Sequence, residues 1–162
     1  MPGRFDAREL FAALTRHDVA YVTIGGIAIQ AHGGQRLTQD LDIAIAASSE
    51  NLERLASSLL ELDARILGPD GQRSRATPTA ALLGSSDHWC LITAHGLLDI
   101  VTLPAHLGTF DEMLARAHLT PLGDLTVPIA RREDLLEMKR AAGRPQDLAD
   151  IQLLESLDDE AT

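Results

Sequence analysis

Apolar positions recur every three or four residues in two stretches of the chain, a spacing typical of amphipathic helices. The first stretch runs from about 7 to 17 and follows Asp6, and the second runs from 50 to 62 and follows Ser48 and Ser49. Aspartate and serine are favoured helix N-caps, so both starts are well marked. Further helices are predicted at 27–31, 111–117, 131–142 and 145–157.

Short apolar runs lie between these helices, and their β-branched residues predict strands. They occupy 20–24, 41–46, 89–93 and 97–103, and a small hairpin follows at 119–127. The order of helices and strands, with two helices at the end, predicts an α/β (α+β) fold. We expect a small mixed β-sheet flanked by helices, with a C-terminal helical pair.

The composition is that of a soluble globular protein, since 45% of the 162 residues are hydrophobic and 23% are charged. This length predicts a single domain over 1–162, with a core at about 18–128 and the helical pair at about 130–158. No apolar stretch approaches the ~20 residues that span a bilayer, and the N-terminus lacks a signal-peptide hydrophobic region. The lone cysteine, Cys90, excludes an internal disulfide. We therefore expect a cytoplasmic protein with no membrane partner.

Acidic residues outnumber basic ones by 24 to 14, which gives a net charge of −10. Tight non-specific binding to nucleic acid needs clustered positive charge, so this balance argues against a broad nucleic-acid surface. Two local clusters, Arg73 with Arg75 and Arg131 with Arg132, still offer contacts to individual phosphates. The charge therefore restricts the partner class without identifying the partner.

Two aspartates, Asp40 and Asp42, stand at the start of the predicted strand 41–46. Side chains two apart on a strand point to the same face, so both carboxylates project together while Leu41 packs on the other face. Carboxylates held so close repel each other unless a cation lies between them, and hard oxygen ligands suit Mg²⁺. Asp99 is a further acid inside an apolar run, where it should face a metal, an arginine or a solvent-lined site. The three acids together favour a metal site.

The pair Gly25-Gly26 separates the predicted strand 20–24 from the predicted helix 27–31. Glycine lets the backbone approach a ligand closely, and the free N–H groups at a helix start attract anions. A tight strand-to-helix turn without a ligand is the simpler explanation of a glycine pair on its own. The pair becomes informative only together with the aspartates that follow it.

Together these residues resemble the signature of the DNA polymerase beta-like nucleotidyltransferase superfamily. The chain has Ile24-Gly25-Gly26, a spacer of thirteen residues at 27–39, and then Asp40-Leu41-Asp42-Ile43. Finer features resemble the abortive-infection and type IV toxin branch of that superfamily, namely Gly25-Gly26-Ile27-Ala28, His32-Gly33 and Arg36-Leu37-Thr38. The late residues Lys139 and Arg144-Pro145-Gln146-Asp147 also resemble that branch, although Gln146 stands where the branch usually has a lysine.

The resemblance implies a nucleotidyltransferase fold and the transfer of NMP from an NTP, such as ATP, to an acceptor hydroxyl, with release of pyrophosphate. It implies that Asp40, Asp42 and Asp99 are catalytic and hold Mg²⁺, or Mn²⁺ in its place. It further implies that the triphosphate lies over Gly25 and Gly26, and that Asp99 accepts the proton of the hydroxyl.

Three further residues are candidates for nucleotide binding, and each has an alternative role. Arg36 either reaches a phosphate or pairs with Asp40. Thr38 is expected to hydrogen-bond locally and shape its loop. Lys139 either reaches the nucleotide or lies on a solvated helix face. His32 is expected to end a helix, and no role is assigned to His88, His95, His106 and His118, which lack ligand spacing.

The first functional hypothesis is the toxin of a bacterial toxin–antitoxin pair, which would modify tRNA or a protein and have a cognate antitoxin as partner. The alternative is a small-molecule nucleotidyltransferase that inactivates an antibiotic, and a net charge of −10 suits a cationic drug better than an RNA. The third hypothesis is a nucleotide-binding or regulatory module without catalysis, against which the three aspartates argue. No residue pattern identifies the nucleobase.

Overall fold

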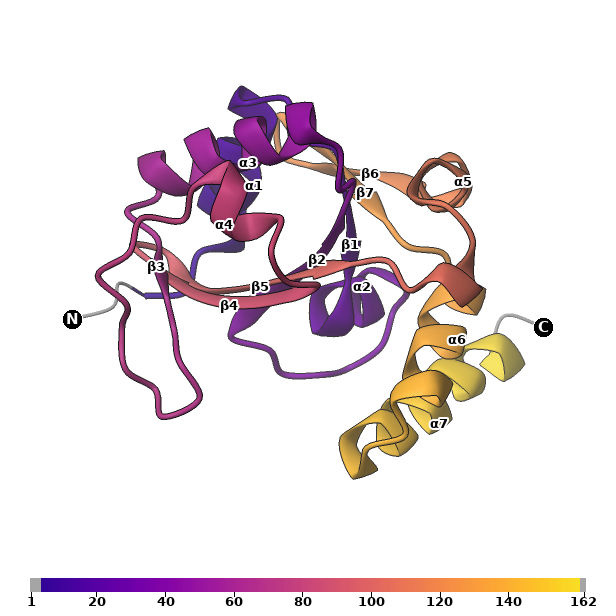
Figure 1. Cartoon of the computed structure of the whole chain (residues 1–162). Helices are drawn as coiled ribbons and strands as arrows, with labels where there is room; N and C mark the ends of the chain where they lie inside the picture. Colours follow the sequence, from indigo (N-terminus) through magenta and orange to yellow (C-terminus); the bar gives the residue numbers. More distant parts are fainter. Residues whose placement is uncertain (1–3, 161–162) are drawn as a thin grey trace.

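A seven-stranded mixed sheet runs through the computed structural model, which describes residues 4–160 (Figure 1). The strand order is β3-β4-β5-β2-β1-β7-β6. The strands are β1 (Tyr21–Ile24), β2 (Asp40–Ile45), β3 (Arg65–Ile66), β4 (His88–Thr93), β5 (Gly96–Thr102), β6 (His118–Leu122) and β7 (Leu125–Ile129). Because β2 pairs antiparallel with β1 and parallel with β5, the sheet is mixed at its centre, as the predicted fold class requires.

Helices lie on both sides of this sheet (Figure 1). They are α1 (Ala7–Arg16), α2 (Gly25–Ala31), α3 (Ser49–Glu61), α4 (Ala80–Leu83), α5 (Phe110–Arg116), α6 (Arg132–Ala142) and α7 (Pro145–Glu160), with a short 3-10 turn η1 (Ala105–Leu107). In Figure 1, α1, α3 and α4 lie above the sheet, whereas α2 and the pair α6 and α7 lie below it. None of the helices within residues 4–160 has the length and apolarity needed to cross a bilayer.

The predicted N-caps of the two long early helices are confirmed. Asp6 accepts the backbone N–H of Glu9 at 3.2 Å, and Ser48 accepts that of Asn51 at 3.2 Å. Each cap satisfies one of the N–H groups that a helix start leaves unpaired, which fixes where the helix begins. His32 follows α2 as its C-cap, also as predicted, and its Nε2 lies 2.8 Å from the carbonyl oxygen of Ala130.

Alternation along β2 separates the core from the face that bears the acids. Leu41 and Ile43 are fully buried, whereas Asp40 and Asp42 are half-buried on the other face. The same hydrophobic cluster includes residues from α1, α3, β5 and the two C-terminal helices, such as Leu10, Leu55, Leu98, Leu136 and Leu154. The sheet that positions the acids is therefore held by apolar packing from both ends of the chain.

The structure corrects several element boundaries. Two elements were not predicted: β3 has two residues and depends on pairing with β4, and α4 has four residues capped by Thr79. Elements this short carry no periodicity, so only their tertiary partners define them. The helix predicted at 27–31 begins earlier, at Gly25, and the predicted hairpin 119–127 extends to Ile129.

Candidate active site

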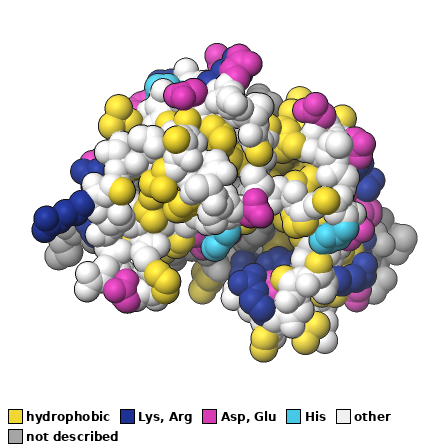
Figure 2. Space-filling view, viewed as in Figure 1, with side chains coloured by type: hydrophobic (Ala, Val, Ile, Leu, Met, Phe, Trp, Pro, Cys, Tyr) yellow, Lys and Arg dark blue, Asp and Glu magenta, His cyan; other side chains and the backbone are white. Residues whose placement is uncertain are grey.

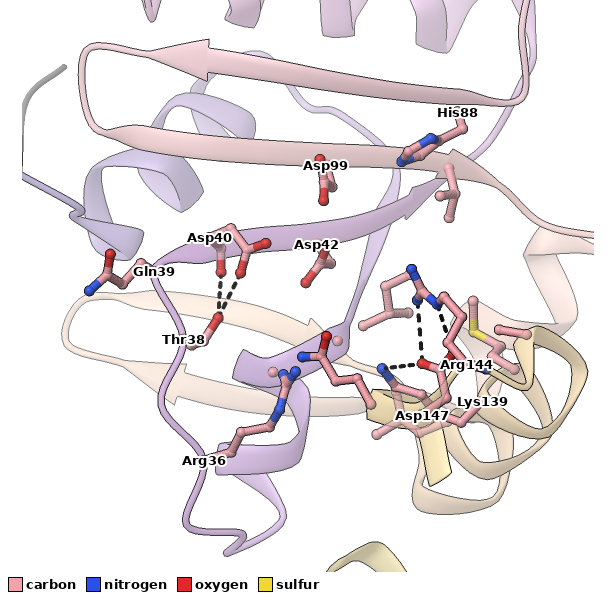
Figure 3. Close-up of a pocket in the computed structure, with 18 of the residues that line it drawn as sticks. Arg36, Thr38, Gln39, Asp40, Asp42, His88, Asp99, Lys139, Arg144 and Asp147 are labelled. Carbon is pink, nitrogen blue, oxygen red and sulfur yellow. Dashed lines mark hydrogen bonds and ion pairs between the residues drawn. The ribbon is translucent and has the colours of Figure 1, made fainter. Parts of the chain in front are cut away.

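Three carboxylates converge on one face of the central sheet (Figure 3). β2 carries Asp40 and Asp42, and its parallel neighbour β5 places Asp99 opposite Asp42. One carboxylate oxygen from each residue lies within 4.8 Å of the other two, and all three residues are half-buried. We call them the acid triad. The sequence indicated that Asp40 and Asp42 share a face, and the pairing of β2 with β5 brings Asp99 to them.

The electrostatics of the acid triad favour a bound cation. Burial, followed by the negative charges of Asp40 and Asp99, raises the pKa of Asp42 to about 7. Oδ1 of Asp99 is buried and has no hydrogen-bond partner among the residues that the structure describes. Ionised carboxylates in such a setting are costly unless a positive charge neutralises them. The donor set therefore fits a divalent cation that prefers oxygen ligands, such as Mg²⁺ or Mn²⁺.

The loop before β2 orients the first of these acids. The hydroxyl of Thr38 lies 2.8 Å from Oδ1 and 3.1 Å from the carbonyl oxygen of Asp40, within donating distance of both. The predicted local hydrogen bond of Thr38 is therefore confirmed. Because a hydroxyl that donates to a carboxylate oxygen fixes the rotamer of the acid, Thr38 holds Asp40 towards Asp42.

The glycine pair allows the strand-to-helix turn to pass close to the acid triad. Gly25 has a φ angle of +70°, and a Cβ atom there would lie 2.1 Å from Oδ2 of Asp42. A Cβ atom at Gly26 would lie 2.5 Å from Nη1 of Arg36 and 2.9 Å from Oγ1 of Thr38. Any other residue at Gly25 would therefore displace the carboxylate and strain the backbone.

A second group of charged residues faces the acid triad from the helical pair. On α6, Nζ of Lys139 lies 3.3 Å from Oδ1 of Asp147 and 3.0 Å from Oδ2 of Asp150. Nε of Arg36 lies 2.9 Å from Oδ1 of the same Asp150. Arg144 donates its backbone N–H to Asp147 at 3.1 Å and its Nε at 2.8 Å. We call these five residues the paired-charge network.

The paired-charge network excludes one of the two alternatives predicted for Arg36 and one of the two predicted for Lys139. Arg36 pairs with Asp150 of α7 and not with Asp40. The side chain of Lys139 is only 15% exposed, so the solvated helix face is wrong for this residue. Asp147 is buried, and its hydrogen bonds with Arg144 and Lys139 lower its pKa to about 2.

A cleft of about 580 Å³ lies between the acid triad and the paired-charge network, and it brings together all of the predicted site residues. These are Gly25, Gly26, Arg36, Thr38, Asp40, Asp42, Asp99 and Lys139. Figure 2 shows the hollow, with Lys and Arg side chains gathered beside it over the helical pair. His88, for which no role was predicted, also lines the cleft. Only the pairing of β4 with β5 brings this residue to the site.

The basic clusters considered for nucleic-acid contact lie outside this cleft. Nε of Arg131 lies 3.2 Å from Oδ2 of Asp134, and Nε of Arg132 donates to the carbonyl oxygen of Leu154 at 2.8 Å. Arg73 and Arg75 lie on the exposed loop that precedes α4. Among the described residues that line the cleft, none belongs to these clusters.

Cys90 lies beside the acid triad as an unreactive thiol. It pairs with Asp99 across β4 and β5 and is half-buried. Burial and the nearby carboxylate of Asp99 raise the pKa of the thiol to about 12, so it stays protonated at neutral pH. Since the thiolate is the reactive form, a thiol that stays protonated is a poor nucleophile.

Comparison with known proteins connects this geometry to one fold class. The sequence matches no known protein family and no curated protein. The crystal structure of the lincosamide antibiotic adenylyltransferase LnuA with lincomycin bound has a TM-score of 0.61 at 17% identity, over 96% of this chain and 99% of that one. The crystal structure of ANT(2″)-Ia in complex with adenylyl-2″-tobramycin has a TM-score of 0.59 at 15% identity, over 94% and 90%.

A solution structure of the antibiotic-resistance factor ANT(2″)-Ia gives a TM-score of 0.57 at 14% identity, over 91% of this chain and 80% of that one. Likenesses at this level of identity establish the fold. The chain therefore has the nucleotidyltransferase fold, as predicted. The finer resemblance to the abortive-infection and toxin branch stays a prediction.

Proposed function

We propose that this protein is a metal-dependent nucleotidyltransferase that transfers NMP from an NTP to a hydroxyl group of a small molecule. The observation that carries the proposal is the acid triad, in which a buried oxygen of Asp99 has no partner among the described residues. The fold supports the same reaction class, because its structural neighbours include a lincosamide adenylyltransferase. Sequence and structure thus point to one chemistry.

The acid triad would hold the metal, and the residues around it prepare it for that role. A bound divalent cation neutralises charge on the transferring phosphoryl group and helps to orient the phosphates. Thr38 fixes the carboxylate of Asp40, and Gly25 leaves room for that of Asp42. Preorganised groups of this kind favour the transition state because they need little rearrangement during the reaction.

The transfer itself needs one proton acceptor. The oxygen of the acceptor forms a bond to the α-phosphorus while the bond from that phosphorus to the pyrophosphate oxygen breaks. Pyrophosphate leaves with the electron pair of the broken bond. The proton of the acceptor hydroxyl passes to a carboxylate oxygen of Asp99, the acid whose buried Oδ1 is otherwise unsatisfied. Positioning and electrostatics account for catalysis, with no covalent intermediate on the protein.

We assign the leaving phosphates to the end of the cleft where Gly25 and Gly26 lie close to Arg36. Lys139 lines the same cleft from α6, so two cationic side chains face that end. Both cations are shared with Asp150, which leaves them positioned before any ligand binds. The side chain of Arg144 is 72% exposed, so its guanidinium has donors available for a phosphate oxygen.

A small molecule is the acceptor class that we favour over RNA. Arg131 and Arg132 are engaged with other protein groups, and Arg73 and Arg75 lie away from the cleft, so no basic path leads to the acid triad from these clusters. A net charge of −10 further weakens attraction to a long RNA. The two crystal structures of similar fold hold lincomycin and adenylyl-2″-tobramycin, which are small molecules.

The experiment supplies labelled ATP, GTP, CTP and UTP with Mg²⁺ to three acceptor pools. The pools are total tRNA, cell protein and an antibiotic panel that includes tobramycin and lincomycin. We expect the wild-type protein to label a small molecule and Asp42→Ala to label nothing. Asp111→Ala removes an exposed acid of α5 away from the cleft and should behave like the wild type.

The same experiment distinguishes the competing functions. Labelling of tRNA or protein alone would replace the small-molecule acceptor with the substrate of a toxin. Transfer by Asp42→Ala at the wild-type rate would remove the acid triad from the mechanism. Calorimetry that detects no binding of any of the four NTPs in Mg²⁺ would leave a regulatory module without nucleotide chemistry.

A further inference from the structure

The strand order of the sheet arranges the functional groups of the cleft in a row. Gly25 follows β1, Asp42 lies in β2, Asp99 in β5 and His88 in β4, and these four strands are consecutive neighbours in the sheet. All four residues line the cleft. The row therefore runs from the glycine turn, through the acid triad, to an imidazole at the opposite end.

The geometry of in-line transfer determines which end of this row faces the acceptor. The attacking and leaving oxygens lie on opposite sides of the phosphorus during phosphoryl transfer. If pyrophosphate leaves at the end near Gly25 and Arg36, the acceptor hydroxyl must arrive from the opposite end, beyond Asp99. The cleft residues on that side are Val101 of β5 and His88 of β4. That end of the cleft therefore carries the imidazole of His88.

The position of His88 suits contact with an acceptor held at Asp99. Cys90 pairs with Asp99 and His88 pairs with Val101, so His88 is the diagonal neighbour of Asp99 across two antiparallel strands. Diagonal neighbours lie about 7–8 Å apart, which leaves space for a ligand group between the two side chains. Figure 3 shows the ring of His88 reaching over β5 into the cleft.

The imidazole of His88 is also available to a ligand. The residue is exposed, and neither ring nitrogen makes a hydrogen bond to any residue of the described part of the chain. By contrast, Nε2 of His32 and that of His17 lie close to a carbonyl oxygen and a carboxylate respectively. A neutral imidazole offers one donor and one acceptor, which match a hydroxyl or an amine.

We propose that His88 binds the acceptor, through a hydrogen bond to a second hydroxyl or amine close to the attacking one. This inference rests on the proposed function and specifies which end of the cleft takes the acceptor. It identifies the acceptor class as a molecule with neighbouring polar groups, one hydroxyl that attacks beside Asp99 and a second polar group that reaches His88.

The test compares His88→Ala and His88→Gln with the wild type, using whichever of tobramycin, lincomycin, tRNA or cell protein the wild type labels. The loss of one hydrogen bond predicts an acceptor KM about three- to tenfold higher in His88→Ala at saturating NTP. His88→Gln keeps a donor and an acceptor and should recover part of the loss. The NTP dissociation constant, measured by calorimetry in Mg²⁺, should not change in either variant.

His106→Ala is the matched control, because His106 is exposed on η1 and does not line the cleft. His106→Ala should leave the acceptor KM and the NTP dissociation constant at their wild-type values. An unchanged acceptor KM in His88→Ala would overturn the inference while leaving the proposed function intact, and so would an equal weakening of NTP binding. A wild-type protein that labels none of the probes would overturn the proposed function, and the inference with it.

Discussion

Two groups of acids lie on opposite sides of one cleft, and their surroundings differ completely. Among the described residues, no cationic side chain forms an ion pair with the acid triad on the sheet, and burial and the neighbouring carboxylates raise the pKa of Asp42 to about 7. On the helical pair, Asp147 contacts Arg144 and Lys139, and its pKa falls to about 2. The two pKa values move in opposite directions because the helices supply cationic partners to Asp147, whereas the neighbours of Asp42 on the sheet are acids.

Under the proposed function, this difference separates acids that stabilise the protein from acids that would hold a ligand. Asp147 and Asp150 have their charge balanced within the chain and attach α7 to α6 and to the loop that contains Arg36. The acid triad leaves its charge unbalanced, which is costly in the folded protein and useful only when a cation binds. The two groups of acids differ in whether a cationic side chain pairs with them, so equivalent substitutions in each group test this difference.

The largest expected effect is the loss of transfer when a metal ligand is removed. We expect Asp42→Ala to lower the rate of nucleotidyl transfer about 10³-fold, because a bound cation contributes several kcal/mol to the transition state. The measurement is the initial rate of label transfer at saturating NTP and Mg²⁺. A loss of less than tenfold, with the fold intact by circular dichroism, would contradict the role of the acid triad.

On the opposite side of the cleft, substitution of an acid in the paired-charge network should lower the stability of the fold. Asp147→Asn removes a charge that pairs with Lys139 and Arg144, and the side chain of Asp147 is only 1% exposed. Breaking a buried pair in this way typically costs about 3–5 kcal/mol, which denaturant unfolding would measure. Asp124→Asn is the control, because Asp124 pairs with Arg8 at the surface, where water screens the charges, and this substitution should cost far less stability than Asp147→Asn.

The pairing of Asp147 also predicts how this stability depends on pH. Its pKa is about 2 in the folded protein and 3.8 in the reference state, so the folded protein binds the proton less tightly. Its contribution is present above about pH 4 and is lost as the pH falls towards 2. The difference in unfolding free energy between the wild type and Asp147→Asn should therefore shrink over that range. A constant difference from pH 7 to pH 2 would contradict the pairing.

The glycine turn allows a direct test of close approach to the acid triad. Gly25→Ala combines a φ angle of +70° with a clash against Asp42, whereas Gly33→Ala has a φ angle of +97° and no atom within 4 Å of the added Cβ. Backbone strain alone costs about 1–2 kcal/mol. We expect both variants to lose this much stability, but only Gly25→Ala to lose transfer as well. Equal activities would show that the close approach is unimportant.

The smallest effect is a gain in stability from removing a repelling charge. The pKa of Asp42 is raised, so its contribution to stability is greatest below the reference value of 3.8 and is lost as the pH rises to about 7. Asp42→Asn should therefore melt a few degrees above the metal-free wild type at pH 8, by a smaller margin at pH 5, and at nearly the same temperature below about pH 4. Adding Mg²⁺ at pH 8 should stabilise the wild type only. The opposite order at pH 8 would contradict the repulsion.

The central elements could be predicted from the sequence because their signals are local. Asp40 and Asp42 face one way because they alternate with Leu41, and Asp6 and Ser48 cap their helices because the cap bond spans three residues. The position of His88 in the cleft depends on how β4 pairs with β5, and the ion pair of Arg36 depends on where α7 lies. Such contacts between distant segments have no local pattern.

The register of β5 against β2 shows why an apolar strand tolerates an acid. Side chains alternate between faces, so a shift of β5 by one residue would turn Asp99 into the core, where Leu98 is fully buried. A carboxylate without a partner there would cost several kcal/mol, whereas a leucine in place of Asp99 would make the shifted pairing far less costly. Asp99 therefore helps to select the correct alignment of the sheet while the protein folds, before any substrate is present.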